Sequence, residues 1–291
     1  METKTITDIC EAVLADTPML PLKDIEKSLI KTYKKDIFAP FVQTINQYNM
    51  IEPGDKIAIG VSGGKDSLLL AKLFQELKRH NKIPFDIVFL SMDPGFHERN
   101  KKKLIDNCEA LGIPLEIRES EVFHVAGKLA SDNPCYLCAR MRRGFLYRAA
   151  LDLGCNKLAL AHHFDDVIET TMLNILYEGQ FMTMVPKVKA KNFEGIELIR
   201  PMMQVKEKDI IRWIKHSGIQ AMNCGCTVTA KRTSSKRREI KALIETLRKN
   251  NPHVDQMIYT SATNVNLDAI LGYRKKDKKV DYNDIYKERS K

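Results

Sequence analysis

The chain has 291 residues, enough for one large α/β domain with appendages or for two small domains. Hydrophobic residues make up 44% of it and charged residues 29%, a globular mixture that excludes intrinsic disorder and a fibrous repeat. The formal net charge of +10 favours a polyanionic partner or an acidic membrane surface.

Membrane and secretion signals are missing from the sequence. No apolar run approaches the roughly 18 to 20 residues that span a bilayer, and the start of the chain lacks a basic segment followed by an apolar one. Seven cysteines in such a chain indicate reduced thiols, metal ligands or redox chemistry rather than disulfides. We therefore expect a soluble, cytoplasmic protein.

The first predicted element is helical, because apolar residues recur at helical spacing over 23–49, with Pro40 as a kink. After residue 54, short apolar runs alternate with helical patterns. The predicted strands cover 56–61, 85–92, 114–118 and 157–161, and the predicted helices cover 66–80, 97–111, 139–153, 164–177 and 206–217. This alternation predicts an α/β fold with a doubly wound parallel sheet and ligands at the C-terminal strand ends. The polar segment 186–197 is expected to be a loop.

A glycine-rich loop, SGGKDS at 62–67, follows the first predicted strand and opens a helix. Glycines allow close backbone approach, and free N–H groups at a helix N-terminus bind anions. The loop is not a Walker A motif, because Asp66 stands where that motif has Ser or Thr, and Ile59 stands where it has its first glycine. The sequence therefore predicts a phosphate-binding loop of another kind.

A second polar string, AHHFDDVIET, follows the strand predicted at 157–161. Asp165 and Asp166 in this string could hold Mg²⁺ against phosphate oxygens, because hard divalent cations prefer oxygen ligands. Alternatively, Asp165 could cap the following helix. The position of the string at a strand end, opposite the phosphate loop, favours the site.

Four cysteines form two close pairs: Cys135 with Cys138, and Cys224 with Cys226. An arginine-rich helix follows the first pair, and nearby positive charge lowers the pKa of a thiol. A thioredoxin-like context is absent, which argues against a redox dithiol. By ligand count the cysteines support structural zinc about as well as an iron–sulfur cluster held by three thiolates.

Composition divides the chain into an N-terminal helical extension over 1–53, an α/β domain over 54–221 and a basic, helical C-terminal region over 222–291. Two runs carry the positive excess: 231–249 has eight Lys/Arg and two Glu, and 274–291 has eight Lys/Arg and four Asp/Glu. Such runs are usually the solvated side of a helix. Beside a phosphate loop and a cysteine centre, they favour contact with a nucleic-acid backbone.

The motif SGGKDS resembles the PP-loop of the ATP-pyrophosphatase superfamily, whose members cleave ATP to AMP and pyrophosphate while adenylating a carbonyl oxygen. CYLCARMRRGFLYRAA, AHHFDDVIETTMLNILY and IRPMMQVKEKDI resemble the tRNA 2-thiocytidine synthetase family, which sulfurates an anticodon-loop cytidine. The resemblance covers 50–245 in separate blocks. It implies an adenine nucleotide alpha hydrolase-like fold, ATP, Mg²⁺, a [4Fe-4S] cluster held by three cysteines, and a homodimer.

The resemblance also implies roles for individual residues. Asp165 would be the catalytic acid or base, or a Mg²⁺ ligand, and Arg142 would orient the base or stabilise developing charge. Cys135 and Cys138 would be cluster ligands that take part in catalysis, and the third ligand would be Cys226 or else Cys224. ATP would be bound by Gly60, Ser62, Gly63, Gly64, Lys65, Asp66, Ser67, Met92, His162 and Asp165.

The expected activity is ATP-dependent tRNA thiolation, in which the C2 carbonyl oxygen of a cytidine is adenylated and then replaced by sulfur. The sulfur donor would be sulfide or a cysteine-desulfurase persulfide, and tRNA would bind the basic C-terminal region. The alternatives are a 2-thiouridine synthetase, a lysidine-type or amidating ligase, and a non-catalytic nucleotide- or RNA-binding protein with structural zinc. The 2-thiouridine branch usually has N-terminal zinc-binding cysteine pairs, and this chain has only Cys10 there.

Overall fold

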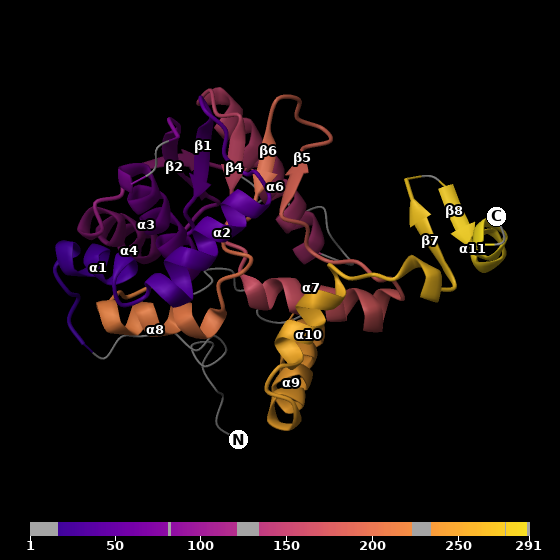
Figure 1. The fold of residues 1–291 in the computed structure, drawn as a ribbon. Helices are drawn as coiled ribbons and strands as arrows, with labels where there is room; N and C mark the ends of the chain where they lie inside the picture. Colours follow the sequence, from indigo (N-terminus) through magenta and orange to yellow (C-terminus); the bar gives the residue numbers. More distant parts are fainter. Residues whose placement is uncertain (1–16, 81–82, 121–133, 223–233, 277, 290–291) are drawn as a thin grey trace, which may run out of the picture.

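The computed structural model describes residues 17–80, 83–120, 134–222, 234–276 and 278–289. Its centre is a six-stranded sheet with the strand order β3-β2-β1-β4-β6-β5 (Figure 1). All neighbouring strands pair in parallel except β5, which pairs antiparallel with β6 at one edge. The strands are β1 (Lys56–Gly60), β2 (Asp86–Asp93), β3 (Leu115–Glu119), β4 (Lys157–Ala159), β5 (Lys187–Lys189) and β6 (Glu197–Ile199). The predicted doubly wound sheet is confirmed.

The loop prediction for 186–197 is wrong in part, because this segment contains β5. Val188 pairs with Leu198, and the β5 side chains remain partly exposed. An edge strand obtains its backbone hydrogen bonds from one neighbour and needs few apolar side chains. A short, polar edge strand therefore carries little periodicity in the sequence.

Helices cover both faces of the sheet, because successive side chains of β1 are apolar and point to opposite faces. Ile57 and Ile59 face one core, which includes α3 (Lys65–His80), α4 (Glu98–Ala110) and α8 (Glu207–Ser217). Ala58 faces a second core, formed with α6 (Pro134–Asp152). Successive residues of a strand point to opposite faces, so a strand buried on both sides reads as a continuous apolar run.

The N-terminal helices belong to the first of these cores. They are α1 (Leu22–Ile30), the π-helical turn η2 (Lys34–Phe38) and α2 (Ala39–Gln47), which confirms the helical prediction for this part of the chain. The Phe41 and Phe74 rings meet edge to face with centroids 5.4 Å apart. Pro40 lies in the first turn of α2, where its missing N–H costs no hydrogen bond, and the π-helical turn precedes it.

A smaller helical layer follows on the C-terminal side. Here α7 (Phe164–Glu178) packs against α9 (Ser234–Asn250) and α10 (Val254–Ser261), which extend away from the sheet below α7 in Figure 1. Ile168 of α7 and Ile240 and Ile244 of α9 are buried in this contact. The Phe164 and Tyr259 rings stack with centroids 5.0 Å apart.

The chain ends in a separate hairpin unit of η3 (Leu267–Ala269), β7 (Gly272–Lys275), β8 (Lys278–Asp281) and α11 (Tyr282–Arg289). This unit lies at the right of Figure 1, away from the sheet. Val280 and Ile285 are buried within it. The C-terminal region is thus helical only in part, because its last basic run forms a hairpin followed by a short helix.

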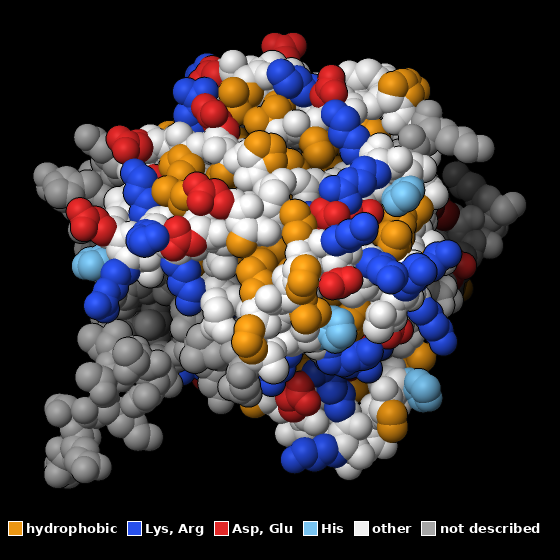
Figure 2. Space-filling model, turned by 90° about the vertical axis from the view of Figure 1, so that its left-hand side faces the viewer, with side chains coloured by type: hydrophobic (Ala, Val, Ile, Leu, Met, Phe, Trp, Pro, Cys, Tyr) orange, Lys and Arg blue, Asp and Glu red, His pale blue; other side chains and the backbone are white. Residues whose placement is uncertain are grey.

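The molecular surface at the opposite end has mixed charge. Figure 2 shows this face, on which Lys and Arg side chains alternate with Asp and Glu side chains and with scattered apolar atoms. Within the described ranges, no helix has the length and apolar character needed to cross a membrane.

Candidate functional site

The strand order places two loops together at one edge of the sheet. The chain leaves β1 towards β2 and β3 on one side, and later returns to β4 on the other side of β1. The loop after β1 and the loop after β4 therefore flank the point where the strand order reverses, which is where open α/β sheets bind their ligands. The SGGKDS loop and the HHFDD string occupy these two positions.

Gly63 in the phosphate loop and Gly60 at the end of β1 both lie close to neighbouring side chains. Gly63 has a φ of +81°, and a Cβ atom there would overlap Met222 Sδ. A Cβ atom on Gly60 would lie 2.8 Å from Leu160 Cδ2. Only glycine combines the left-handed backbone with this close approach at position 63.

The two serines of the loop hold its shape. The Ser67 hydroxyl donates to the Gly64 carbonyl oxygen at 2.9 Å and accepts from the Ser62 N–H at 3.1 Å. The loop is thus preorganised by its own hydroxyl groups, with α3 beginning at Lys65 directly behind it. The orphan N–H groups of that first turn are the donors expected for phosphate.

Lys65 and Asp66 start α3 and form an ion pair, with Lys65 Nζ 3.1 Å from Asp66 Oδ2. Asp66 Oδ1 is buried and has no hydrogen-bond partner. Burial alone would lower the pKa of Lys65, but the nearby charges of Asp66 and Glu207 raise it. Lys65 therefore carries a full positive charge at neutral pH.

Met92, one of the residues expected to bind ATP, lies near the end of β2 and contacts α6. It is 9% exposed and packs against Met141, Phe145 and Leu146 of α6. Asp93, the next residue, accepts the N–H groups of Gly95 and Phe96 and fixes the turn after β2.

His162 is a neutral imidazole at the start of the second loop. Burial lowers the pKa of His162 to about 4, and the positive charge of Arg200 contributes to the shift, while Asp166 opposes it. Its Nδ1 is buried without a hydrogen-bond partner. An unpaired ring nitrogen in a buried position is available to a ligand.

Asp165 and Asp166 have different partners. Asp165 Oδ2 accepts the Glu207 N–H at 2.7 Å, and Asp165 Oδ1 lies 2.9 Å from Arg248 Nη2. Asp166 Oδ2 accepts the His163 N–H at 3.0 Å. Asp166 therefore caps α7, whereas Asp165 caps α8 rather than the helix on which it lies.

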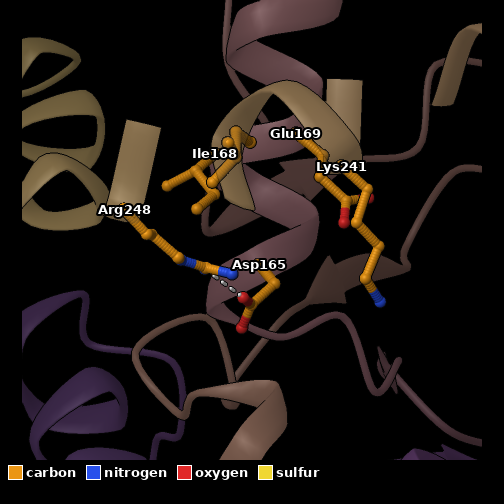
Figure 3. A pocket seen from close by; sticks show the side chains of 6 residues that line it. Asp165, Ile168, Glu169, Lys241 and Arg248 are labelled. Carbon is orange, nitrogen blue, oxygen red and sulfur yellow. Dashed lines mark hydrogen bonds and ion pairs between the residues drawn. The ribbon is translucent and has the colours of Figure 1, made fainter. Parts of the chain in front are cut away.

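A small pocket lies between α7 and α9, with about 170 Å³ of space that is partly open to solvent. Ligand pockets commonly hold about 300–1,000 Å³, so this space is too small for ATP. Figure 3 shows Arg248 reaching Asp165 on one side of the pocket, with Glu169 and Lys241 on the other. The pocket is lined by Asp165, Ile168, Glu169, Lys241, Ile244 and Arg248.

The site also contains several charged residues that were not predicted from the sequence as members of it. Arg237 of α9 lies 2.7 Å from both Asp166 Oδ1 and Glu169 Oε2. Glu207 of α8 lies 3.2 Å from Lys65 Nζ and 2.8 Å from Lys241 Nζ. Local sequence gives no signal for these pairs, because the partners are distant along the chain.

Arg200 is a further missed residue, although it lies in the motif IRPMMQ that carries the family resemblance. Its side chain is buried, its Nη1 donates to the Val185 carbonyl oxygen at 2.6 Å, and its Nε has no partner. Burial, together with the charge of Arg143, lowers the pKa of Arg200 to about 10. A buried guanidinium with an open donor suits an anionic ligand.

Cys135 and Cys138 lie in the first turns of α6, three residues apart. Residues at this spacing share one side of a helix, and the first turn of α6 contains no acidic residue. Because α6 leads directly into β4, its N-terminal end lies at the sheet edge that holds the phosphate loop. Arg142 is half-buried one turn further along α6.

Cys224 and Cys226 lie outside the described residues, as does Cys10. The described segment before them ends at Met222, whose N–H donates to the Gly63 carbonyl oxygen at 2.8 Å. Cys108 and Cys155 are free and buried, as expected for packing residues. Burial raises the pKa of the Cys108 thiol to about 12, which excludes it as a thiolate at neutral pH.

Metal ligation by the acidic residues remains a prediction. Within the part of the chain that the structure describes, no three His, Cys, Asp or Glu side chains are grouped so as to hold a metal ion. Both oxygens of Asp165 already accept a hydrogen bond, from the Glu207 N–H and from Arg248, so a Mg²⁺ ion or a proton would compete with these partners for Asp165.

Comparison with known proteins agrees with the presence of a phosphate loop in the site. A family model described as the PP-loop domain matches residues 33–223. A tRNA-cytidine(32) 2-sulfurtransferase of Syntrophotalea carbinolica is 35% identical over 237 residues, which cover 81% of this chain and 91% of that protein. The enzyme of that name from Pelobacter propionicus is 35% identical over 77% of this chain and 83% of its own length.

Two further comparisons extend this result. A Neisseria gonorrhoeae tRNA-cytidine(32) 2-sulfurtransferase is 41% identical over 186 residues, but the match spans only 57% of that protein. The solved structure of the U34-tRNA thiolase NcsA from Methanococcus maripaludis, with its [4Fe-4S] cluster, is 23% identical and has a TM-score of 0.63 over 81% of this chain and 80% of that one. This likeness shows a shared fold. By its PP-loop domain and its relatives, the chain belongs to the tRNA-cytidine(32) 2-sulfurtransferase family.

Proposed function

We propose that this protein is an ATP-dependent tRNA thiolase that converts an anticodon-loop cytidine to 2-thiocytidine. The observation that carries the proposal is the preorganised SGGKDS loop at the reversal point of the sheet, in a chain whose named relatives match over most of their length. The helix α6, which has Cys135 and Cys138 near its N-terminus, begins at the edge of the sheet that holds this loop.

The first step would activate the base. The C2 carbonyl oxygen of cytidine attacks the α-phosphorus of ATP, and pyrophosphate leaves. Backbone N–H groups of the phosphate loop and the Lys65 ammonium would bind the phosphates, since fixed positive groups stabilise developing negative charge in a dry site. Neutral His162 would offer its unpaired Nδ1 to the nucleotide. Arg200 would supply its open Nε to an anionic oxygen.

The cysteines suit a [4Fe-4S] cluster by their chemistry. Cys135 and Cys138 lie three residues apart at the N-terminal end of α6, whose first turn contains no acidic residue. A helix N-terminus stabilises thiolates. Cys226 or Cys224 would supply the third thiolate. When bound, a cluster with three protein ligands supplies an iron with an open coordination position for sulfur.

The second step would exchange oxygen for sulfur. Sulfide attacks C2 of the adenylated base, and AMP leaves with the former carbonyl oxygen. If a cysteine-desulfurase persulfide supplies the sulfur, a second thiol must cleave the S–S bond of the persulfide, and that thiol is oxidised to a disulfide with the carrier cysteine. Arg142 lies one helical turn after Cys138 and would orient the base or stabilise the charge that develops there. Asp165 would serve as acid or base once Arg248 releases it.

Mg²⁺ would accompany ATP in this proposal. Asp66 Oδ1 is a buried carboxylate oxygen without a hydrogen-bond partner, and it lies at the start of α3 beside the phosphate loop. Carboxylate oxygens and phosphates are the usual ligands of Mg²⁺. Asp66 is therefore better prepared than Asp165 to bind the ion.

Binding of tRNA would depend on the C-terminal region, and its two basic runs differ. Arg237, Lys241 and Arg248 of α9 form ion pairs with acidic residues of the site. The Lys and Arg side chains of the β7–β8 hairpin are exposed, and none forms an ion pair within the described ranges: Arg274, Lys275, Lys276, Lys278 and Lys279. We therefore assign the phosphate-backbone contact to the hairpin.

A cytoplasmic homodimer completes the proposal. Exposed apolar side chains gather at the end of α7 and in the segment after it, including Leu176, Phe181 and Met182, which are 52%, 49% and 53% exposed. Monomeric proteins seldom expose a contiguous apolar patch of this kind. Analytical ultracentrifugation measures the expected dimer.

The test is anaerobic reconstitution with iron and sulfide, followed by reaction with ATP and tRNA. Mass spectrometry of the nucleosides should show 2-thiocytidine, with AMP and pyrophosphate released in equal amounts. Cys135→Ser should abolish the product and lower the iron content, while Cys108→Ser, the matched control in a buried position, should leave the iron content unchanged. A product of 2-thiouridine, bound zinc without iron, or no pyrophosphate release would contradict the proposal.

A further inference from the structure

Lys65 of the phosphate loop is linked to the C-terminal helix α9 through one carboxylate. Glu207 Oε1 lies 3.2 Å from Lys65 Nζ, and Glu207 Oε2 lies 2.8 Å from Lys241 Nζ. The Lys65 and Glu207 side chains are 19% and 17% exposed, so water competes weakly for this contact. The three residues come from α3, α8 and α9, which are far apart in the sequence.

Glu207 itself is held firmly. It is the first residue of α8, and its N–H donates to Asp165 Oδ2 at 2.7 Å. A helix N-terminus stabilises a carboxylate. Burial alone would raise the pKa of Glu207, but the hydrogen bond from Lys241 and the charge of Lys65 lower it to about 2. Glu207 is thus a fixed negative charge throughout the neutral pH range.

We propose that Glu207 is a positioning residue for Lys65 and that Lys241 of α9 positions Glu207 in turn, which makes α9 a part of the ATP site. The inference rests on the proposed use of ATP. A free lysine side chain loses considerable rotamer entropy when it binds a phosphate. Glu207 reduces that loss by holding the ammonium beside the loop before ATP arrives. Lys241 shares the Glu207 charge, so that Glu207 orients the ammonium without competing strongly with phosphate.

The way α9 is docked supports this role. Arg237, Lys241 and Arg248 are four and seven residues apart, a spacing that places them along one side of the helix. Ile240 and Ile244, which lie between them in sequence, are buried against α7. Four side chains of α9 besides Lys241 therefore hold the helix, namely Arg237, Ile240, Ile244 and Arg248, so removal of the Lys241 ammonium should leave the helix docked.

The experiment measures binding of a non-hydrolysable ATP analogue by calorimetry, without tRNA, and the KM for ATP in pyrophosphate release. Glu207→Gln should weaken nucleotide binding and raise this KM by about tenfold, the effect typical of losing a charged hydrogen bond. Lys241→Met should weaken binding several-fold, and Lys241→Arg should restore it. Affinity for tRNA should change by less than about twofold in all three variants.

A double variant and a control separate positioning from general stability. Glu207→Gln combined with Lys241→Met should bind the analogue no worse than Glu207→Gln alone, because both changes break the same chain of contacts. Lys249→Met removes another lysine from α9, one without an ion pair in the described part of the chain, and should leave analogue binding unchanged.

Three results would overturn the inference: unchanged or tighter analogue binding by Glu207→Gln, additive effects in the double variant, or an equal loss in Lys249→Met. A wild-type protein that does not bind the ATP analogue would instead contradict the proposed function. The two failures are therefore distinguishable.

Discussion

At the scale of single residues, the site is marked by buried polar atoms that have no partner. Asp66 Oδ1, His162 Nδ1 and Arg200 Nε are all buried without a hydrogen bond. Unsatisfied buried groups are uncommon because each costs about 1–3 kcal/mol. They lie at the start of α3 and in the segments after β4 and β6, at the edge of the sheet where we expect the ligand.

His162 gives a prediction for the pH dependence of stability. Its pKa is about 4 in the folded protein, below the ordinary value of 6.5. Between these two values the unfolded chain binds a proton that the folded protein does not, so the free energy of unfolding falls as the pH falls. His162→Gln should reduce the loss of stability between pH 7 and pH 5 by about 1–2 kcal/mol, measured by urea unfolding.

The control for this prediction is His253→Gln, which removes an exposed histidine. It should leave the difference between the two pH values as in the wild type. Parallel curves for His162→Gln and the wild type would show that His162 titrates normally in the folded protein.

Gly63 and Gly54 give a matched pair of substitutions. Both have a left-handed backbone, with φ of +81° and +86°, but a Cβ atom on Gly54 meets nothing within 4 Å. Either change to alanine should lower the free energy of unfolding by about 1 kcal/mol through backbone strain. Only Gly63→Ala should also weaken ATP binding, because its Cβ would overlap Met222 Sδ, and the Met222 side chain beside the loop would have to move. Calorimetry with the ATP analogue measures this difference, and equal binding by the two variants would contradict it.

At the scale of elements, the central finding is that α9 packs on the acidic side of the site. Its apolar residues contact α7, and its cations neutralise carboxylates that α7 and α8 present. Three cations of the helix that was expected to contact tRNA, Arg237, Lys241 and Arg248, are therefore paired with carboxylates of the site. Its net effect on the site is to fix Asp165, Asp166 and Glu207 as paired anions.

Docking of α9 can be tested at one apolar contact. Ile244→Ala should destabilise the α7–α9 contact by about 2–4 kcal/mol, because Ile244 is 2% exposed and its truncation leaves a cavity. Hydrogen exchange in α9 should accelerate, while exchange in the sheet should change little. The control is Leu243→Ala, the neighbouring residue, which is 38% exposed and should have little effect. Equal exchange in both variants would mean that α9 is held elsewhere.

At the scale of the whole molecule, the two ends differ in the sign of their exposed charges. The β7–β8 hairpin lies at one end of Figure 1, and α1 lies at the other. The face near α1 mixes acidic and basic side chains (Figure 2). The hairpin instead exposes a group of basic side chains around its turn: Arg274, Lys275, Lys276, Lys278 and Lys279. This asymmetry favours one docking end for a polyanion.

Charge removal at the two ends tests that asymmetry. Changing Lys275, Lys278 and Lys279 to alanine should weaken tRNA binding and reduce the slope of log affinity against log salt by about 2–3. The matched control changes Lys31, Lys34 and Lys35, which are exposed near α1 and carry the same total charge. Filter binding at several salt concentrations measures both. Equal slopes in the two variants would show that the hairpin is not the docking surface.

Much of the fold and of the site could be predicted from the sequence, because local patterns encode them. Short apolar runs between helical periods specify the buried parallel strands, and the SGGKDS and CxxC motifs carry the phosphate loop and the cysteine pair. The exceptions follow the same logic. The edge strand β5 has too little buried surface to leave a pattern, and Arg200 stands alone in its segment.

The sequence by itself determined the sheet, the nucleotide loop, the cysteine pair and the family. Only the tertiary structure decided which charged side chains form ion pairs with one another. Asp165 is bound to Arg248, which lies 83 residues away, and Glu207 is bound to Lys65 and Lys241 from two other helices. Local propensity cannot encode such pairs, because they form only after packing brings distant helices together and removes water from between their charges.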